Sequence, residues 1–242
     1  MMGDRALRVD GLVNARDLGG LRRPNGSFTP RGVFFRSENV DRVSEAGWGQ
    51  IWEAGIRTVV DLRQPSERGC DVGSRPGWLT MRQVDLDGLD NEDFWSNYWD
   101  NGLKGTALYF LPHLHAMPER ARAALSAILN APPGGVMFHC MSGRDRTGMI
   151  AMLLLRAVDA DTEDIVDDYL ETVRLGELRA ASANQDNDEN AREELCRSHG
   201  TTTENAFRSA LSQFQLPAFL TSAGLSEPDR QALCSWRNTI QH

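Results

Sequence analysis

The sequence predicts an α/β fold, with a central, mostly parallel sheet flanked by helices and a helical C-terminal portion. Short runs of apolar and β-branched residues alternate with helical patterns up to about residue 176, which is typical of βαβ units. Beyond that point every predicted element is helical. We therefore expect one domain over residues 1–242, with an α/β core at about 12–175 and a helical extension at about 176–242 that caps it.

The first part of the chain is expected to supply three strands and one helix. An apolar core at residues 31–37 and a β-branched run at residues 57–63 predict buried strands. Between them, residues 44–54 have helical spacing with Ser44 as the N-cap. The alternation at residues 79–86 predicts another strand.

Residues 87–110, which are rich in Asp, Asn, Gly and aromatic residues, are predicted to be a loop with a short helix around 94–99. Residues 119–130 predict an amphipathic helix, and the Pro and Gly residues at 132–135 end it. The run at residues 136–140 then predicts a fully buried strand.

The rest of the chain is predicted to be helical apart from one polar segment. Helical patterns cover residues 147–158 and 162–176, whereas residues 180–191 predict a mobile loop or linker. Three short helices are expected after it, at about 202–214, 216–223 and 227–238.

Composition and charge restrict the possible functions. The chain has 242 residues, of which 40% are hydrophobic and 25% charged, as in soluble globular proteins. Its formal net charge is −8, so we do not expect it to bind nucleic acid, whose partners are usually basic. No apolar run approaches the roughly 20 residues of a membrane-spanning helix. An anionic substrate would need a local gathering of arginines and backbone N–H groups.

The cysteines and the N-terminus predict a cytoplasmic protein. The first residues lack the apolar segment of a secretory signal. Four cysteines are widely and irregularly spaced, which predicts neither a disulfide framework nor a zinc site. We expect no metal and no cofactor, and we interpret three of the cysteines as free thiols: Cys70, Cys196 and Cys234.

The strongest chemical signal is the stretch from His139 to Gly148, HCMSGRDRTG, between a predicted strand and a predicted helix. Such a turn directs successive backbone N–H groups toward a bound anion. The same field stabilises a thiolate at Cys140, placed to attack phosphorus. Arg146 follows at the spacing needed to bind two phosphoryl oxygens. The predicted phosphate contacts are Met141, Ser142, Gly143, Arg144, Asp145, Arg146 and Thr147.

Neighbouring residues are expected to support this chemistry. Gly143 and Gly148 permit tight turns. The Thr147 hydroxyl is expected to hydrogen-bond the Cys140 sulfur, and His139 to support the loop rather than to transfer protons. The alternative interpretation is a core cysteine with surface arginines.

These residues resemble the signature loop of the protein tyrosine phosphatase superfamily, HCxxGxxR(S/T)G. With Asp145 between two arginines, the loop is similar to the HCxxGKDRTG loop of bacterial atypical tyrosine and dual-specificity phosphatases. Residues 14–20 and 31–37 resemble that branch's N-x-R-D-L-G-G and R-G-x-h-x-R-S motifs, where h is apolar. Residues 59–63 with Glu67 resemble its V-I-D-L-R…E motif.

The resemblance covers about residues 12–175. It implies a cysteine-phosphatase-like fold and metal-independent hydrolysis of phosphomonoesters through a phosphocysteine intermediate. One position departs from the family pattern, because the loop lysine is Arg144 here. In the family that lysine is associated with binding a second anionic group, as in phosphoinositides. A rigid guanidinium differs in geometry from a flexible ammonium, so phosphoinositide hydrolysis is not carried over.

Cleavage of a phosphate ester also needs an acid for the leaving oxygen. Asp145 is the first candidate, and the resemblance favours it. Asp61 is the second, because it ends a predicted strand whose carboxyl end faces the same crevice. Asp87 is the third, although we interpret it and Asp85 as solvated loop carboxylates.

Other candidates have two interpretations. Arg16, Asp17 and Arg36 either line the pocket or form a structural network, and Arg63 is expected to pair with Glu67 or a neighbouring carboxylate. No histidine has metal-ligand spacing. Core packing is favoured over a pocket wall for five aromatic residues: Trp95, Tyr98, Trp99, Tyr109 and Phe110.

The sequence therefore predicts a cysteine-dependent phosphomonoester hydrolase whose partner is a phosphorylated substrate. That substrate is a phosphoprotein or, alternatively, a small molecule such as a nucleotide, a sugar phosphate or a biosynthetic intermediate. An inactive phosphate-binding module is a remote alternative, against which Cys140, Asp145 and Arg146 argue. Sulfur transfer and arsenate reduction are disfavoured because no relay cysteine is suitably placed.

Overall fold

The computed structural model describes residues 5–68 and 75–240, so Cys70 lies outside the described residues. Five strands form one sheet in the order β1-β2-β5-β3-β4. β1 is antiparallel to β2 and the other neighbours are parallel, which confirms the predicted α/β class. The strands are β1 (Arg16–Asp17), β2 (Phe34–Ser37), β3 (Ile56–Asp61), β4 (Thr80–Gln83) and β5 (Gly135–His139).

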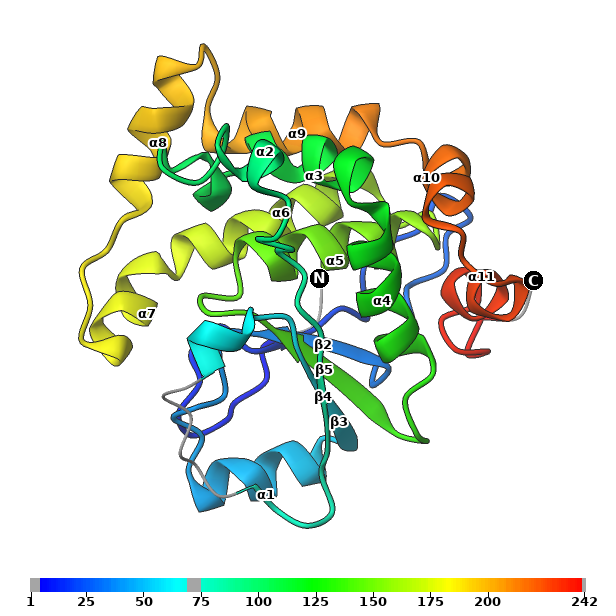
Figure 1. Ribbon diagram of the computed structural model, residues 1–242. Coiled ribbons are helices and arrows are strands. Elements are labelled where there is room, and N and C mark those ends of the chain that lie inside the picture. Colours follow the sequence, from blue (N-terminus) through cyan, green and yellow to red (C-terminus); the bar gives the residue numbers. More distant parts are fainter. Residues whose placement is uncertain (1–4, 69–74, 241–242) are drawn as a thin grey trace.

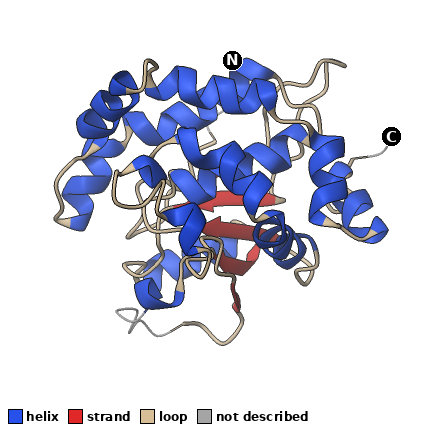
Figure 2. Ribbon diagram, turned by 45° about the horizontal axis from the view of Figure 1, so that its top comes forward, coloured by secondary structure: helices blue, strands red, loops and turns tan. Residues whose placement is uncertain are grey.

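Helices surround the sheet (Figure 2), and in the described part of the chain every secondary-structure element after β5 is a helix. Within the described ranges, none of them is long and apolar enough to cross a membrane. The short 3₁₀ helices are η1 (Pro65–Arg68), η2 (Leu103–Gly105) and η3 (Ala107–Tyr109). The α-helices are α1 (Glu45–Glu53), α2 (Glu92–Trp95), α3 (Phe110–Ala116), α4 (Pro118–Leu129), α5 (Asp145–Arg156), α6 (Thr162–Arg174), α7 (Gly176–Ala183), α8 (Glu189–Ser198), α9 (Thr203–Gln213), α10 (Leu216–Ala223) and α11 (Glu227–Cys234).

The central strands are buried on both faces of the sheet. Phe35 and Val59 belong to a core shared with α1, whereas Phe34 and Val60 belong to the larger core on the other face. Figure 1 shows α1 on one side of the sheet and α4 and α5 on the opposite side. Burial on both faces explains why these strands are continuous apolar runs in the sequence.

The C-terminal helices pack on the same core as the sheet. Trp236 is fully buried and donates a 3.0 Å hydrogen bond from Nε1 to the Leu154 carbonyl. Its ring meets Phe34 of β2 edge to face, with 5.1 Å between the centroids. Phe207 of α9 stacks on Tyr169 of α6 at 4.1 Å. The C-terminal helices therefore share a core with the sheet and with α6.

The polar segment predicted as a loop at residues 180–191 is mostly helical, which corrects that prediction. α7 continues to Ala183 and α8 begins at Glu189, so only residues 184–188 connect them. Asn184 has a φ of 52° and ends α7 in the left-handed conformation. The alanines before this connection and the Glu and Arg residues after it favour helix. Only the Asn- and Asp-rich centre of the segment remains a loop.

Other helices also differ from expectation. The short helix expected around 94–99 is α2, at Glu92–Trp95. α3 was not predicted; it begins at the last residue of the predicted loop, and its Pro112 falls in the first turn, where a missing N–H is tolerated. α5 begins at Asp145, two residues earlier than predicted. α11 ends at Cys234 because the residues from Trp236 to Asn238 have positive φ angles.

The strand order brings three carboxyl ends together. Ser37, His139 and Asp61, the last residues of β2, β5 and β3, lie in register on neighbouring strands. In parallel sheets, ligands bind at the carboxyl edge, where the loops after the strands meet. The stretch HCMSGRDRTG leaves the middle strand at this edge.

Candidate active site

The loop of residues 140–146 connects β5 to the first turn of α5. Cys140 is buried at the end of β5, with 2% of its surface exposed. Asp145 and Arg146 already belong to α5, whose N-terminus carries a partial positive charge. The predicted placement of the cysteine between a buried strand and a helix N-terminus is therefore found in the structure.

Three carbonyl groups of this loop are held from outside by side chains of the N-terminal segment. Asn39 donates to the Met141 carbonyl at 3.0 Å and Asn14 to the Ser142 carbonyl at 3.2 Å. Arg36 donates to the Gly143 carbonyl at 2.7 Å. In a planar trans peptide the N–H points opposite to the C=O, so the following N–H groups face the other side of the loop. Successive N–H groups on one side of a loop are an arrangement that can bind an anion.

Gly143 is required by the backbone at this turn. Its φ is +69°, and a Cβ there would lie 2.4 Å from the Ser37 carbonyl oxygen. The loop can therefore approach the end of β2 closely only with glycine at this position.

His139 supports the loop from inside the sheet. Its side chain is fully buried, with Nδ1 3.0 Å from the Cys140 carbonyl oxygen and 4.0 Å from Asp61 Oδ1. Burial lowers the pKa of His139, although Asp61 opposes the shift. The predicted hydrogen bond from Thr147 is not formed, since its buried hydroxyl has no hydrogen-bond partner in the described chain.

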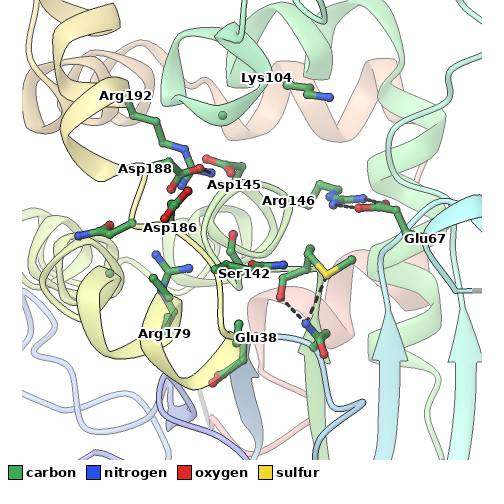
Figure 3. A pocket seen from close by; sticks show the side chains of 18 of the residues that line it. Glu38, Glu67, Lys104, Ser142, Asp145, Arg146, Arg179, Asp186, Asp188 and Arg192 are labelled. Carbon is green, nitrogen blue, oxygen red and sulfur yellow. Dashed lines mark hydrogen bonds and ion pairs between the residues drawn. The ribbon is translucent and has the colours of Figure 1, made fainter. Parts of the chain in front are cut away.

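Two carboxylates hold Arg146 (Figure 3). Glu67, in η1, pairs with both terminal nitrogens, at 2.8 Å from Nη2, and Asp87 lies 2.8 Å from Nη1. Burial lowers the pKa of Arg146, but Glu67, Cys140 and Asp87 outweigh it and hold that pKa well above its usual value. Glu67 therefore orients Arg146. The family motif includes Glu67, but it did not indicate that Arg146 is its partner.

Asp87 is not a solvated loop carboxylate, which corrects that interpretation. It is 6% exposed and faces Arg146. Burial raises the pKa of Asp87 to about 6, with Arg146 opposing the shift and Glu67 adding to it. Such a carboxyl group can hold a proton near neutral pH, as a general acid must.

Asp61, the second candidate acid, lies outside the cavity. It is 2% exposed and pairs with Arg63 at 2.9 Å. Burial raises its pKa, but the Arg63 hydrogen bonds outweigh burial and lower it overall. Arg63 therefore pairs with neighbouring carboxylates, Asp61 and Asp41, and not with Glu67.

A cavity of about 390 Å³ opens beside the loop. Of the predicted contacts, Met141, Ser142, Asp145 and Arg146 line it, together with Asp87, whereas Gly143 and Thr147 do not. Figure 3 shows Ser142, Asp145 and Arg146 at the cavity. The opposite wall comes from α7, α8 and the connection between them, which the sequence did not predict. Arg144, in contrast, is fully buried and does not line the cavity.

Arg16 and Arg36 belong to a buried structural network. Asp168 of α6 lies 2.9 Å from Arg16 Nε and 2.6 Å from Arg36 Nη1. Arg5 joins the same carboxylate at 2.9 Å. Asp17 instead accepts hydrogen bonds from backbone N–H groups of its neighbours. Since Arg36 also holds the Gly143 carbonyl, this network supports the loop from behind.

The remaining candidates divide between core and cavity. Trp99 and Tyr109 line the cavity, whereas Trp95 and Phe110 are core residues and Tyr98 stacks on Phe94. In the described ranges, no cluster of His, Cys, Asp or Glu is arranged to hold a metal ion. Cys196 and Cys234 are free thiols.

Comparison with known proteins identifies the family. A family model described as the tyrosine phosphatase family matches residues 7–236. A provisionally named tyrosine-protein phosphatase of Cupriavidus necator is 32% identical over 178 residues, covering 71% of this chain and 64% of its own. A triple specificity protein phosphatase of Mycobacterium tuberculosis is 29% identical over 168 residues, covering 57% and 60%.

A tyrosine-protein phosphatase of Nostoc commune is 26% identical over 144 residues, covering 58% of this chain and 48% of its own. The chain thus spans between about half and two thirds of the length of these relatives. The family model nevertheless extends from before β1 to beyond α11. The chain therefore belongs to the tyrosine phosphatase family.

Proposed function

We propose that this chain is a cysteine-dependent phosphomonoester hydrolase acting on phosphotyrosine and other phosphorylated side chains of proteins. The observation that carries the proposal is the orientation of the 140–146 loop, whose carbonyl groups are held outward by Asn39, Asn14 and Arg36. Its N–H groups and Arg146 then form a site for a phosphoryl dianion beside the Cys140 sulfur. The names of the relatives support this substrate class.

The reaction has two steps. First, Cys140 Sγ attacks phosphorus, an S–P bond forms, the ester P–O bond breaks, and Asp145 gives a proton to the leaving oxygen. Second, water attacks the phosphocysteine, Asp145 accepts the proton of the water, and the S–P bond breaks to release phosphate and the Cys140 thiolate. Arg146 stabilises the equatorial oxygens in both transition states.

A small-molecule phosphomonoester is the second candidate substrate. The cavity of about 390 Å³ lies in the range of small-molecule sites, and its walls come from two sides of the fold. Residues of α7 and α8 face the loop across it, so a small ligand would contact both walls.

Hydrolysis of 4-nitrophenyl phosphate tests the proposal. We expect full activity in EDTA, because neither step uses a metal, and inhibition by micromolar orthovanadate, which mimics the transition state. Acid quenching with a ³²P-labelled aryl phosphate should leave label attached to the chain at Cys140. A strict requirement for a divalent metal, or a failure to trap label in the presence of turnover, would refute the mechanism.

The identity of the acid is tested by leaving-group dependence. Asp145→Asn should lower kcat/KM, which reports the first step, about 10²-fold or more for phenyl phosphate, whose leaving group needs a proton, and much less for 4-nitrophenyl phosphate. If Asp145→Asn retains the wild-type rate on phenyl phosphate while Asp87→Asn loses it, Asp87 is the acid.

Asp87 also predicts a pH effect. Its pKa is about 6, so above that pH its carboxylate competes with the substrate dianion for Arg146. When the wild type and Asp87→Asn are compared with the same substrate, the variant should show a smaller decline in kcat/KM above about pH 6. Identical pH profiles would show that this carboxylate does not control binding.

A further inference from the structure

We propose that Arg144 is a positioning residue: through Glu189 of α8 it fixes the side chain of Asp145 and the 140–146 loop, and it does not contact the phosphoryl group. The inference rests on the proposed function, since it concerns the delivery of a proton by Asp145. It assigns a role to the one loop position at which the chain departs from the family pattern.

The Arg144 guanidinium is bound by three separate segments of the chain. Nη1 donates to Asp145 Oδ1 at 2.9 Å and to the Gly105 carbonyl at the end of η2. Nε lies 2.9 Å from Glu189 Oε2. The guanidinium carbon also lies 5.6 Å from the centre of the Tyr169 ring. With no exposed surface, this side chain is directed into the protein and not into the cavity.

Glu189 is the common ion-pair partner of three arginines behind the loop. Besides Arg144, it pairs with Arg179 of α7 at 2.8 Å and with Arg192 of α8 at 3.3 Å. It is 8% exposed, and a Cβ at Gly176 would lie 2.5 Å from its Cγ. The backbone thus leaves room for this carboxylate, which joins the loop to the two helices that form the opposite wall.

A lysine could not make the same set of contacts. A guanidinium presents five N–H donors in a planar fork, whereas an ammonium is a single flexible charge. A single ammonium nitrogen cannot occupy both the Nη1 position, which meets Asp145 and the Gly105 carbonyl, and the Nε position, which meets Glu189. The chain therefore uses arginine where one group must connect the loop, η2 and α8.

Fixing Asp145 matters because proton transfer depends on the placement of the donor. A displacement of about 1 Å of a catalytic group costs on the order of 10²-fold in rate. Asp145 is partly exposed and lines the cavity, and its ion pair with Arg144 limits the positions of its carboxyl group. Loss of that pair should slow leaving-group protonation and leave phosphate binding intact.

The test uses Arg144→Met and Glu189→Gln, with Glu194→Gln on the exposed side of α8 as the matched control. We expect both variants to lower kcat/KM for phenyl phosphate about 10- to 100-fold, with less than about threefold change for 4-nitrophenyl phosphate. This ratio reports the step in which the leaving group departs, whereas kcat also contains the second step, which the two substrates share. The inhibition constant of orthovanadate should stay within about threefold, because the N–H groups and Arg146 are unchanged. The control should match the wild type.

A double-mutant cycle tests whether the two residues act together. If Arg144 acts through Glu189, the double variant should lose about as much kcat/KM for phenyl phosphate as the more damaging single variant. Arg144→Lys, which keeps the charge, should show the same leaving-group dependence with a smaller loss. It also serves as the second variant if Arg144→Met does not fold.

Two results would overturn the inference. A raised KM and vanadate inhibition constant in Arg144→Met and Arg144→Lys, at unchanged kcat, would place the guanidinium on the phosphoryl group. Equal losses for both aryl phosphates would indicate a general structural role only. If the wild type itself shows no turnover dependent on Cys140, the proposed function fails instead, so the two failures are distinguishable.

Discussion

Cys140→Ser should lower kcat for aryl phosphates by at least about 10³-fold, the scale seen when a catalytic nucleophile is removed. A serine hydroxyl ionises far less readily than a thiol, and it lacks the nucleophilicity of sulfur. The residue lies at the end of β5, directly before the loop carbonyls that are held outward. The substitution leaves those contacts in place.

Phosphate binding should therefore survive in the variant. Calorimetric titration with inorganic phosphate should give a Kd within about threefold of the wild-type value, because the loop N–H groups and Arg146 supply the binding. Cys234 is a partly buried free thiol on α11, so Cys234→Ser is the control and should retain full turnover. Substantial turnover by Cys140→Ser would exclude sulfur as the nucleophile, and unchanged binding with an inactive wild type would indicate a phosphate-binding module.

Asp168→Asn should lower the free energy of unfolding by about 3–5 kcal/mol, the scale for breaking a buried ion pair. Asp168 is 1% exposed and is the common partner of Arg5, Arg16 and Arg36, at 2.9, 2.9 and 2.6 Å. Removing its charge leaves buried guanidinium groups without compensation. Because Arg36 holds the Gly143 carbonyl, activity should fall as well.

Urea unfolding as a function of pH checks this prediction. Burial raises the pKa of Asp168, but Arg16, Arg36 and Arg5 outweigh it, so the folded pKa lies well below the ordinary value. The stabilisation is therefore complete above about pH 4 and is lost as the pH falls toward the folded pKa. The variant should lose less stability on acidification than the wild type. Asp167→Asn, exposed on the same helix, is the control, and an equal loss of stability there would contradict the assignment.

The elements that could be predicted are those whose signal lies within a short stretch of chain. β3 and β5 can be recognised in the sequence as continuous runs of β-branched or apolar residues, because both faces of these strands are buried. Cys140 and Arg146 lie in one strand–loop–helix unit, so their spacing, together with the predicted strand, the glycines and the predicted helix, predicts a phosphate site.

Side chains that meet across long separations could not be predicted. Glu67 and Asp87 reach Arg146 from 79 and 59 residues away. Asp87 reads as an exposed loop residue in the sequence. Only burial in the folded chain, which outweighs the opposing effect of Arg146, raises its pKa to about 6. The partners of Arg144 likewise depend on where η2 and α8 pack.

The amino-acid sequence alone therefore determines the α/β class, the order of most elements and the loop that carries Cys140 and Arg146. Short-range spacing and hydrophobic periodicity suffice to predict these features. Folding in three dimensions establishes which carboxylate faces which arginine, and so assigns Asp61 to a structural pair and Asp87 to the cavity. Charge and burial act through space, and the distances between groups exist only once the sheet and the C-terminal helices have packed together.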